Sequence, residues 1–390
     1  MLKAIPDLEG ILTKTIDRRA ILRALIVLLV AAGAVTAMSL LGSASAAAAT
    51  SEVAAIAAPA DAAAAATSIA PTEAEPVETT SASTGSNRVV QTLVNGIVFG
   101  LLLALASVGV SLIYGTTGLS NFAHGEQVTL GALLTYFFTT QQEVSLPLIP
   151  VSFSIGWPLI PSALVAIALA AGTGWIQDKF LWSPLRRRKV TIVQQMIVSI
   201  GLSLAMLNFI QWWFGAQRVR LTIISDERID MGLFDIGQIT LISVVISLLC
   251  IAGVGYFLLR TRLGRATRAV SDNPALASAS GIRVDGVVRL VWVMATGLAA
   301  VGGILLALYD SGTAFDVGAR LLLLMFAAVT LGGLGQAFGA LVGSLVVGIS
   351  VEMSTLWIGT DLKYAVALGI LILVLLLRPQ GILGRAERVG

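Results

Sequence analysis

The stretch Asn121-Phe122-Ala123-His124-Gly125-Glu126 contains the only histidine of the chain and lies between two apolar runs, 91–113 and 127–140. An amide, an imidazole and a carboxylate are costly at membrane depth, and polar groups found there are by default functional. If the apolar runs cross a membrane, this polar break between them is the first candidate for a functional site.

The composition of the chain supports a membrane fold. The chain has 390 residues, of which 56% are hydrophobic and 12% are charged, and its mean hydropathy is +0.90. A soluble domain carries about 25% charged residues. Several apolar runs reach about 17–23 residues, enough to cross roughly 30 Å of hydrocarbon, and the 39 glycines suit close helix packing. We therefore predict an all-α, polytopic integral membrane helix bundle.

Nine core spans are predicted after residue 87, and two of them are unusual. The spans 127–140 and 321–335 are short for a full crossing and adjoin Gly-rich polar sequence, so broken or re-entrant helices are expected there. The nine spans are 91–113, 127–140, 159–178, 191–213, 237–259, 288–309, 321–335, 338–357 and 362–378.

The N-terminal part of the chain has a different character. Residues 1–23 end in basic residues, 24–41 are apolar, and small residues follow, a pattern that suits a secretory signal or a retained anchor helix. The long basic region favours the anchor. Residues 42–87 are rich in Ala, Pro, Ser, Thr and Glu and lack aromatic and basic residues, which predicts a disordered linker outside the cytoplasm. The folded region is then 88–385, with a short tail at 386–390.

The distribution of basic residues predicts the topology. Lys and Arg concentrate in 179–190, in 260–289 and near the C-terminus, so these regions and residues 1–23 should be cytoplasmic. Basic residues in short loops beside apolar spans do not indicate nucleic-acid binding. The loops that should face outward have few basic residues, and they are 141–158, 214–236, 310–320 and 358–363.

The polar break extends from Tyr114 to Glu126 and contains three glycines, which interrupt the helix. Backbone groups freed at membrane depth need partners in protein or in a water-lined cavity, and transporters use broken helices to hold solutes near the midplane. The alternative is a polar hinge that caps two helices, with His124 hydrogen-bonded to a backbone carbonyl. A lone histidine does not indicate a metal site. We predict a translocation path or gate formed by Asn121, Phe122, His124, Gly125 and Glu126.

The loop 260–289 holds six arginines within 30 residues. Pro274 at the first helical position and Asn273 as its cap predict a short helix over 275–280. A short helix on a basic cytoplasmic loop can dock into a groove of a partner protein. The alternative is a topology determinant that binds anionic lipid headgroups.

A glycine-rich stretch runs from Leu331 to Ala340. We favour a face for close helix packing over a ligand site here. The chain has no Gly-x-x-x-x-Gly-Lys-Ser/Thr motif and no catalytic set around its one histidine, so neither a P-loop ATPase nor an enzyme is predicted. The predicted packing residues are Gly332, Gly333, Gly335, Gly339 and Gly343.

Four landmarks, in order along the chain, resemble those of one family. They are Asn121-Phe-Ala-His-Gly125; Thr261-Arg-Leu-Gly-Arg-Ala-Thr-Arg-Ala269 with Asp272-Asn273 and Gly281-Ile282; Leu331-Gly-Gly-Leu-Gly335; and Arg378-Pro-Gln-Gly-Ile-Leu-Gly-Arg385. They resemble the LivH-type permease subunit of branched-chain amino acid ABC importers, over about residues 88–385. Residues 1–87 and the basic run 186–189 depart from the family pattern.

The resemblance implies a multi-pass permease domain at 88–385 in a bacterial inner membrane, with a cytoplasmic C-terminus. The implied partners are membrane lipid, a second LivM-like permease, two cytoplasmic ATP-binding subunits and an extracytoplasmic solute-binding protein. Partner subunits would use the ATP, and this chain would bind no cofactor and no metal. The implied coupling loop would receive the ATPase stroke through Arg262, Gly264, Arg265, Arg268, Asp272, Asn273 and Gly281.

Three other functions remain open at this point. Relatives of this fold also accept urea or short amides, and nothing in the polar break discriminates among these solutes. An ion-coupled secondary transporter would need buried carboxylates in its spans, and only Glu126 and Glu352, both near span ends, are candidates. The third is a membrane scaffold that docks partners by the basic loop.

Overall fold

The structure is a computed structural model that describes residues 88–140, 142–145, 152–221, 228–359, 362–377 and 380–383. The segments expected at 1–23, 24–41 and 42–87 lie outside the described residues, and so does the tail at 386–390. Strands β1 (Gln142–Ser145) and β2 (Ser152–Ile155) pair in a two-stranded sheet. Except for Ile155, the residues of this sheet belong to a compact unit separate from that of the helices.

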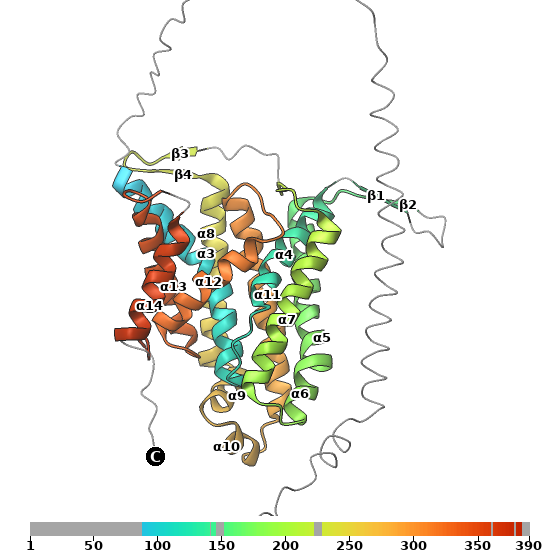
Figure 1. Ribbon diagram of the computed structural model, residues 1–390. Coiled ribbons are helices and arrows are strands. Elements are labelled where there is room, and N and C mark those ends of the chain that lie inside the picture. Colours follow the sequence, from blue (N-terminus) through green and yellow to red (C-terminus); the bar gives the residue numbers. More distant parts are fainter. Residues whose placement is uncertain are drawn as a thin grey trace, which may run out of the picture. The chain divides into compact units, whose positions relative to one another are not determined.

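Each of the nine predicted spans corresponds to one helix (Figure 1). Six helices in the described residues are long and apolar enough to cross a membrane. Helices α4 and α12 have 16 residues each, fewer than the roughly 20 that a crossing needs, as predicted; α14, with 15 residues, is short as well, which was not predicted. The nine are α3 (Arg88–Thr117), α4 (His124–Thr139), α5 (Leu159–Gln177), α7 (Ile192–Phe214), α8 (Gln238–Arg260), α11 (Val284–Tyr309), α12 (Val317–Gly332), α13 (Ala337–Ser354) and α14 (Lys363–Leu377).

Three local features differ from the expectation. The helix that begins as α5 continues through a π-helical turn, η1 (Asp178–Trp182), into α6 (Ser183–Arg187), so most of the basic segment 179–190 is helical rather than a loop. Helix α11 begins at Val284, which places Arg289 in a helix. Strands β3 (Arg228–Asp230) and β4 (Asp235–Gly237) form an unexpected antiparallel hairpin. Charge patterns predict the side of the membrane, but they do not reveal where a backbone stops being helical.

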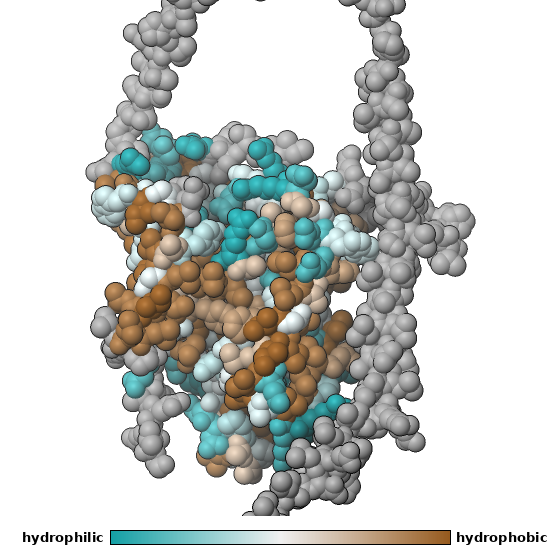
Figure 2. Space-filling model, viewed as in Figure 1, coloured by the Kyte–Doolittle hydropathy of each residue, from teal (hydrophilic) through white to brown (hydrophobic). Residues whose placement is uncertain are grey.

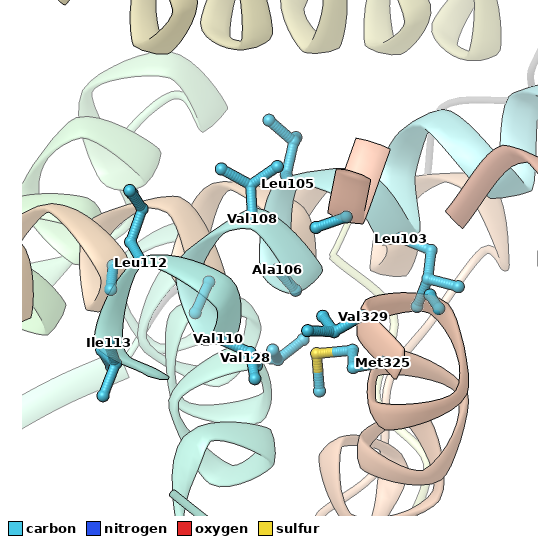
Figure 3. Close-up of a cluster of buried hydrophobic side chains, with 14 of the residues drawn as sticks. Leu103, Leu105, Ala106, Val108, Val110, Leu112, Ile113, Val128, Met325 and Val329 are labelled. Carbon is cyan, nitrogen blue, oxygen red and sulfur yellow. The ribbon is translucent and has the colours of Figure 1, made fainter. Parts of the chain in front are cut away.

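Helix α3 forms the core of the helical part. Every residue from Val98 to Ile113 is buried, and a helix that is apolar all round belongs in the interior of a bundle. It packs against α13, α11, α12, α8 and α9 (Arg262–Asp272). Figure 3 shows the apolar cluster in which Ala106 of α3 lies near Val128 of α4 and Met325 of α12.

Glycines allow the neighbouring helices to approach α3 closely. A Cβ atom added at Gly348 of α13 would lie 2.5 Å from Gly100 Cα, and one added at Gly96 would lie 2.8 Å from Ile349 Cα. Distances this short leave no room for a side chain. Small residues therefore set the spacing between α3 and α13, as they do in many membrane helix pairs.

The outer surface of the helical part carries an apolar band. Figure 2 shows hydrophobic residues across the middle of the visible face and hydrophilic residues toward its two ends. Helices α5, α7 and α8 present large exposed apolar side chains, for example Leu164, Leu204 and Leu249. A band of this kind, bounded by polar ends, is typical of a surface that contacts lipid.

The substitution Gly348→Ala is expected to destabilise the protein by about 1–3 kcal/mol, because the new methyl group overpacks the contact between α3 and α13. Thermal unfolding of the detergent-purified variant, followed by tryptophan fluorescence, measures the change. Gly201→Ala in α7 is the matched control, since nothing lies within 4 Å of the added Cβ there. Equal melting temperatures for the two variants would contradict the close contact.

Candidate functional site

The polar break lies inside the bundle. After α3 the chain turns at Gly118, which has a φ of +68°, and α4 begins at His124. Within the turn, Ala123 N–H donates to Asn121 Oδ1 (3.2 Å). The side chains of Asn121, His124 and Glu126 are polar, yet each residue is at most 1% exposed. Their positions are therefore set by neighbouring helices rather than by solvent.

Helices α3 and α7 supply polar partners to the break. One ring nitrogen of His124, Nε2, lies 3.1 Å from Ala106 O of α3. From α7, the hydroxyl of Ser203 donates to Glu126 Oε1 (2.6 Å). The first turn of α4 is thus held from two sides, and one of the contacts involves a carboxylate.

The N-terminal ends of the two short helices α4 and α12 meet at the break. Gly125 and Gly318 are in close backbone contact, and Gly318 N–H donates to Thr129 Oγ1 (2.8 Å). The rings of Phe122 and Phe326 pack with centroids 5.2 Å apart.

The first turn of a helix has backbone N–H groups without helical partners and carries the positive end of the helix dipole. Two such ends lie side by side here. The start of α4 is buried, whereas the start of α12 also carries the exposed Arg320 and the partly exposed Asp316.

Three polar atoms at the break have no hydrogen-bond partner within the described residues: Asn121 Nδ2, His124 Nδ1 and Glu126 Oε2. Buried polar groups are normally paired, because an unpaired one costs about 1–3 kcal/mol. Three buried polar atoms without a partner in the described part of the chain, all within six residues, are therefore unusual for a segment whose role is only packing.

The structure therefore gathers the predicted path residues at one place, and it also contains what the hinge alternative requires. The hinge needs a hydrogen bond between His124 and a backbone carbonyl, and Ala106 O provides it. The open atoms of Asn121 and Glu126 have no role in a hinge. The five residues brought together are Asn121, Phe122, His124, Gly125 and Glu126.

Several residues around the break were missed by the sequence reasoning. Phe122 N–H donates to Ser199 Oγ of α7 (3.2 Å), and Ser203 follows one helical turn later. Two serines four residues apart in an apolar span share a helix face, and this was the available signal. Gln127 Oε1 accepts from Thr173 Oγ1 of α5 (2.9 Å), a contact that no local pattern indicates.

The basic loop contains two helices, α9 (Arg262–Asp272) and α10 (Pro274–Ala279). The cap of α10 is confirmed, because Asn273 Oδ1 accepts from Leu276 N–H (3.0 Å). Helix α9 was not expected. It has a cap of the same kind, in which Thr261 Oγ1 accepts from Gly264 N–H (2.9 Å).

Helix α9 is amphipathic, and its basic side faces away from the bundle. Thr267 and Val270 are buried, whereas the arginines are exposed. Gly264 differs from the other predicted coupling residues because it is buried against the backbone of Phe257, so it serves packing rather than an outer surface. The exposed members of the predicted set are Arg262, Arg265, Arg268, Asp272, Asn273 and Gly281.

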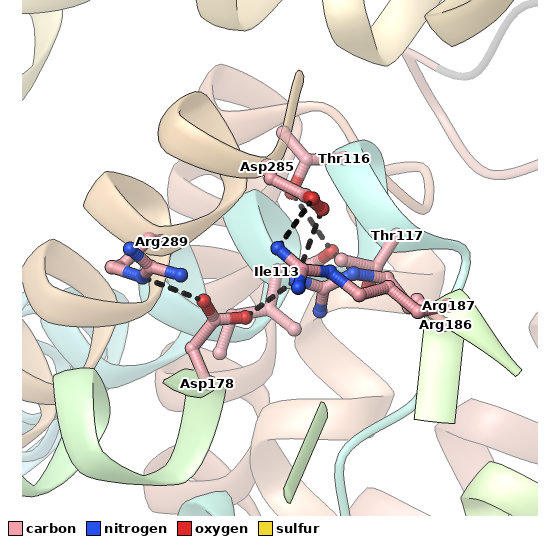
Figure 4. Close-up of polar contacts among 8 residues, drawn as sticks. All are labelled: Ile113, Thr116, Thr117, Asp178, Arg186, Arg187, Asp285 and Arg289. Carbon is pink, nitrogen blue, oxygen red and sulfur yellow. Dashed lines mark hydrogen bonds and ion pairs between the residues drawn. The ribbon is translucent and has the colours of Figure 1, made fainter. Parts of the chain in front are cut away.

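A buried carboxylate links the helices next to the basic loop (Figure 4). Asp178 of η1 is fully buried and pairs with Arg186 of α6 (2.7 Å) and Arg289 of α11 (3.2 Å). Asp285, in the first turn of α11, lies 3.9 Å from Arg186 and 3.5 Å from Arg187. The network joins the extension of α5 to the start of α11, and sequence reasoning did not anticipate it.

The glycine-rich stretch divides into two groups. Gly332 and Gly339 face each other where α12 packs on α13, and Gly343 also lies in this contact. Gly333 and Gly335 have φ values of +110° and +78°, so they form the turn between the two helices. Positive φ marks a turn that glycine allows. Gly335 is also closely packed, as predicted, because a Cβ added there would lie 3.1 Å from Gly115 Cα of α3.

The helices and the buried polar break define a polytopic membrane protein of the transporter class. In the described residues no group of three His, Cys, Asp or Glu side chains could hold a metal ion. The family model of the permease component of branched-chain amino acid transport systems matches residues 92–375. The chain belongs to this family.

Curated relatives agree with the family. The high-affinity branched-chain amino acid transport system permease protein LivH of Escherichia coli (strain K12) is 31% identical over 304 residues, which cover 76% of this chain and 96% of LivH. BraD of Pseudomonas aeruginosa, of the same description, is 29% identical over 308 residues, with coverage of 76% and 96%. Among solved structures, PsaBC from Streptococcus pneumoniae in complex with Fab has a TM-score of 0.38 at 15% identity, covering 74% of this chain and 92% of that chain. A similarity this weak indicates neither the fold nor the function of this chain.

The substitution Asp178→Asn is expected to destabilise the protein by about 1–3 kcal/mol. Removing one partner of a buried pair typically costs about 3–5 kcal/mol, but Arg186 and Arg289 are partly exposed, which reduces the loss. Thermal unfolding in detergent measures it.

Asp285→Asn is the control for this network. Its side chain is 50% exposed and lies farther from the arginines, so a change below about 1 kcal/mol is expected. If both variants melted at the same temperature, the network would not be organised around Asp178.

Proposed function

We propose that this chain is the membrane-spanning permease subunit of an ABC importer for branched-chain amino acids, and that partner subunits hydrolyse the ATP. The observation that carries the proposal is the family match over residues 92–375, together with the similarity to LivH over most of both chains. No ATP site of its own is assigned to this chain, and no cofactor.

The polar break is the proposed path or gate for the solute. Its support is chemical: Asn121, His124 and Glu126 are buried, and each keeps one polar atom without a partner in the described residues. Buried ends of broken helices with open polar groups are the arrangement by which membrane transporters hold polar solutes. A passing zwitterion could exchange hydrogen bonds with these atoms.

Helix α9 is the proposed docking element for an ATP-binding subunit. Its exposed face carries Arg262, Arg265 and Arg268, and short helices on cytoplasmic loops are suited to a groove on a partner. Helices α6, α9 and α10 lie at one end of the helical part, opposite β3 and β4 (Figure 1). With the positive-inside rule, the α9 end and the C-terminus are cytoplasmic in this proposal.

A chain of contacts could carry a movement of α9 to the path. Helices α9 and α10 lead into α11, where Arg289 pairs with Asp178 on the extension of α5. In α5, Thr173 donates to Gln127, the neighbour of Glu126. Coupling through this route requires that an ATP-bound partner contact the loop differently from a free one. The other proposed components are a second LivM-like permease and an extracytoplasmic solute-binding protein.

Arg268→Glu is expected to abolish leucine uptake by the assembled transporter while leaving membrane insertion intact, because it reverses a charge at the proposed docking face. Uptake of radiolabelled L-leucine into proteoliposomes with the partner subunits measures the effect. Arg88→Glu is the control: it is the same charge change on an exposed residue at the start of α3, at the end opposite α9, and uptake should persist. Normal uptake in Arg268→Glu would remove α9 from the coupling role.

Glu126→Gln is expected to raise the KM for leucine uptake by about tenfold, equivalent to roughly 1.4 kcal/mol. The amide oxygen can still accept from Ser203, so the fold is preserved while the charge is lost. Asp285→Asn, an equal charge change on a half-exposed side chain outside the polar break, should leave KM unchanged. Unaltered uptake kinetics in Glu126→Gln would favour the hinge over the path.

One observation keeps an ion-coupled secondary transporter as a second candidate. Glu126 is only 1% exposed, and a buried carboxylate is the kind of group that binds a coupling ion. An uptake assay in cells distinguishes the two candidate functions. Uptake that stops on ATP depletion supports the ABC importer, whereas uptake that survives ATP depletion and collapses with the ion gradient supports the alternative.

A further inference from the structure

The end of the helical part that carries β3 and β4 contains a cavity of about 510 Å³. It lies at the end opposite the basic helices α9 and α10 (Figure 1). Ligand pockets in proteins typically measure about 300–1,000 Å³, so the cavity is large enough for a small solute. Its lining residues come from α3, the β3–β4 hairpin, α8 and the end of α11. Ser311, just after α11, also lines it.

The hairpin wall is fixed in place by one side chain of α3. Gln91 Nε2 donates to Asp235 O (2.9 Å), and Asp235 N–H donates to Gln91 Oε1 (2.8 Å). The same Gln91 amide also donates to Asn95 Oδ1 (3.1 Å). A paired amide of this kind holds strand β4 against the helix, so the cavity has a defined wall on this side.

The cavity has a mostly polar lining that contains two opposite charges and three apolar residues. Arg228 and Asp235 both line it. Arg228 pairs with Gly237 across the hairpin, so Arg228 and Asp235 are diagonal neighbours. Diagonal neighbours have Cα atoms about 7–8 Å apart. In the described residues, the ion pairs involve neither of them. The apolar part of the lining is Val94 and Val98, one turn apart on α3, and Ile236.

We propose that this cavity binds a zwitterionic amino acid with an aliphatic side chain, as an entry site on the extracytoplasmic side. Arg228 takes the α-carboxylate, Asp235 takes the α-ammonium group, and Val94, Val98 and Ile236 contact the side chain. The inference rests on the proposed function, which it deepens by placing a solute site separate from the buried polar break. The solute then reaches the polar break after it has bound at this entry site.

The test measures binding of L-leucine to the full-length chain, purified with its partner subunits in lipid nanodiscs and without the solute-binding protein. Isothermal titration with three probes separates the two charges: L-leucine, leucinamide, which lacks the carboxylate, and 4-methylpentanoate, which lacks the amine. Arg228→Gln should weaken L-leucine binding at least tenfold and leave leucinamide unchanged. Asp235→Asn should weaken both L-leucine and leucinamide at least tenfold and leave 4-methylpentanoate unchanged.

Asp285→Asn is the control for the loss of a carboxylate. Asp285 lies in the first turn of α11, does not line the cavity and is half exposed, so its substitution removes only a charge away from the site. L-leucine binding should not change in this variant. Equal melting temperatures of all three variants and the parent protein establish that the hairpin substitutions act on binding and not on folding.

The entry site is overturned if the parent protein shows no saturable L-leucine binding, or if Arg228→Gln and Asp235→Asn bind all three probes as the parent does. Leucine uptake by the reconstituted transporter distinguishes this failure from failure of the proposed function. If uptake persists while the hairpin variants bind normally, only the entry site in the cavity is rejected. If the complete transporter takes up no leucine, the proposed function itself is rejected.

Discussion

Close backbone contact at glycine is the constraint on which this structure depends. Lipid is as apolar as a leucine side chain, so membrane helices associate by close packing rather than by escape from water. Here Gly348 lies against Gly100, Gly131 against Ala300, and Gly303 against the backbone of Val128. These contacts bring α13 onto α3 and α4 onto α11, and α11 also packs against α3, whose central residues are all buried. The polar break is thereby enclosed by protein rather than by lipid.

A break in a membrane helix leaves backbone groups that must find partners, and the chain supplies these partners from distant segments. Ala106 O receives the His124 ring, and Thr129 Oγ1 receives Gly318 N–H, 189 residues away. The site is therefore assembled from α3, α4, α7 and α12. Its open polar atoms remain where the helices α4 and α12 begin, which is where a passing solute would find both charge and hydrogen-bonding groups.

The sequence was sufficient for features that depend on neighbouring residues. Apolar runs located nine spans, and the pair Asn273-Pro274 located α10, because span length and capping are local properties. The sequence was insufficient where partners lie far apart. Asp178 and Arg289 are separated by 111 residues and Glu126 and Ser203 by 77, and no periodicity records such pairs. Positive φ at Gly333 and Gly335 was also hidden, because turn and packing glycines look alike in a glycine-rich stretch.

The continuity of α5, η1 and α6 has a mechanical consequence. The combined helix Leu159–Arg187 has 29 residues, which at 1.5 Å per residue is about 43 Å, whereas the hydrocarbon layer is roughly 30 Å thick. More than two helical turns therefore lie outside the hydrocarbon layer, and those at the α6 end form a shelf beside the basic loop. Any protein that docks on that loop meets this shelf as well, so a push on one is shared with the other.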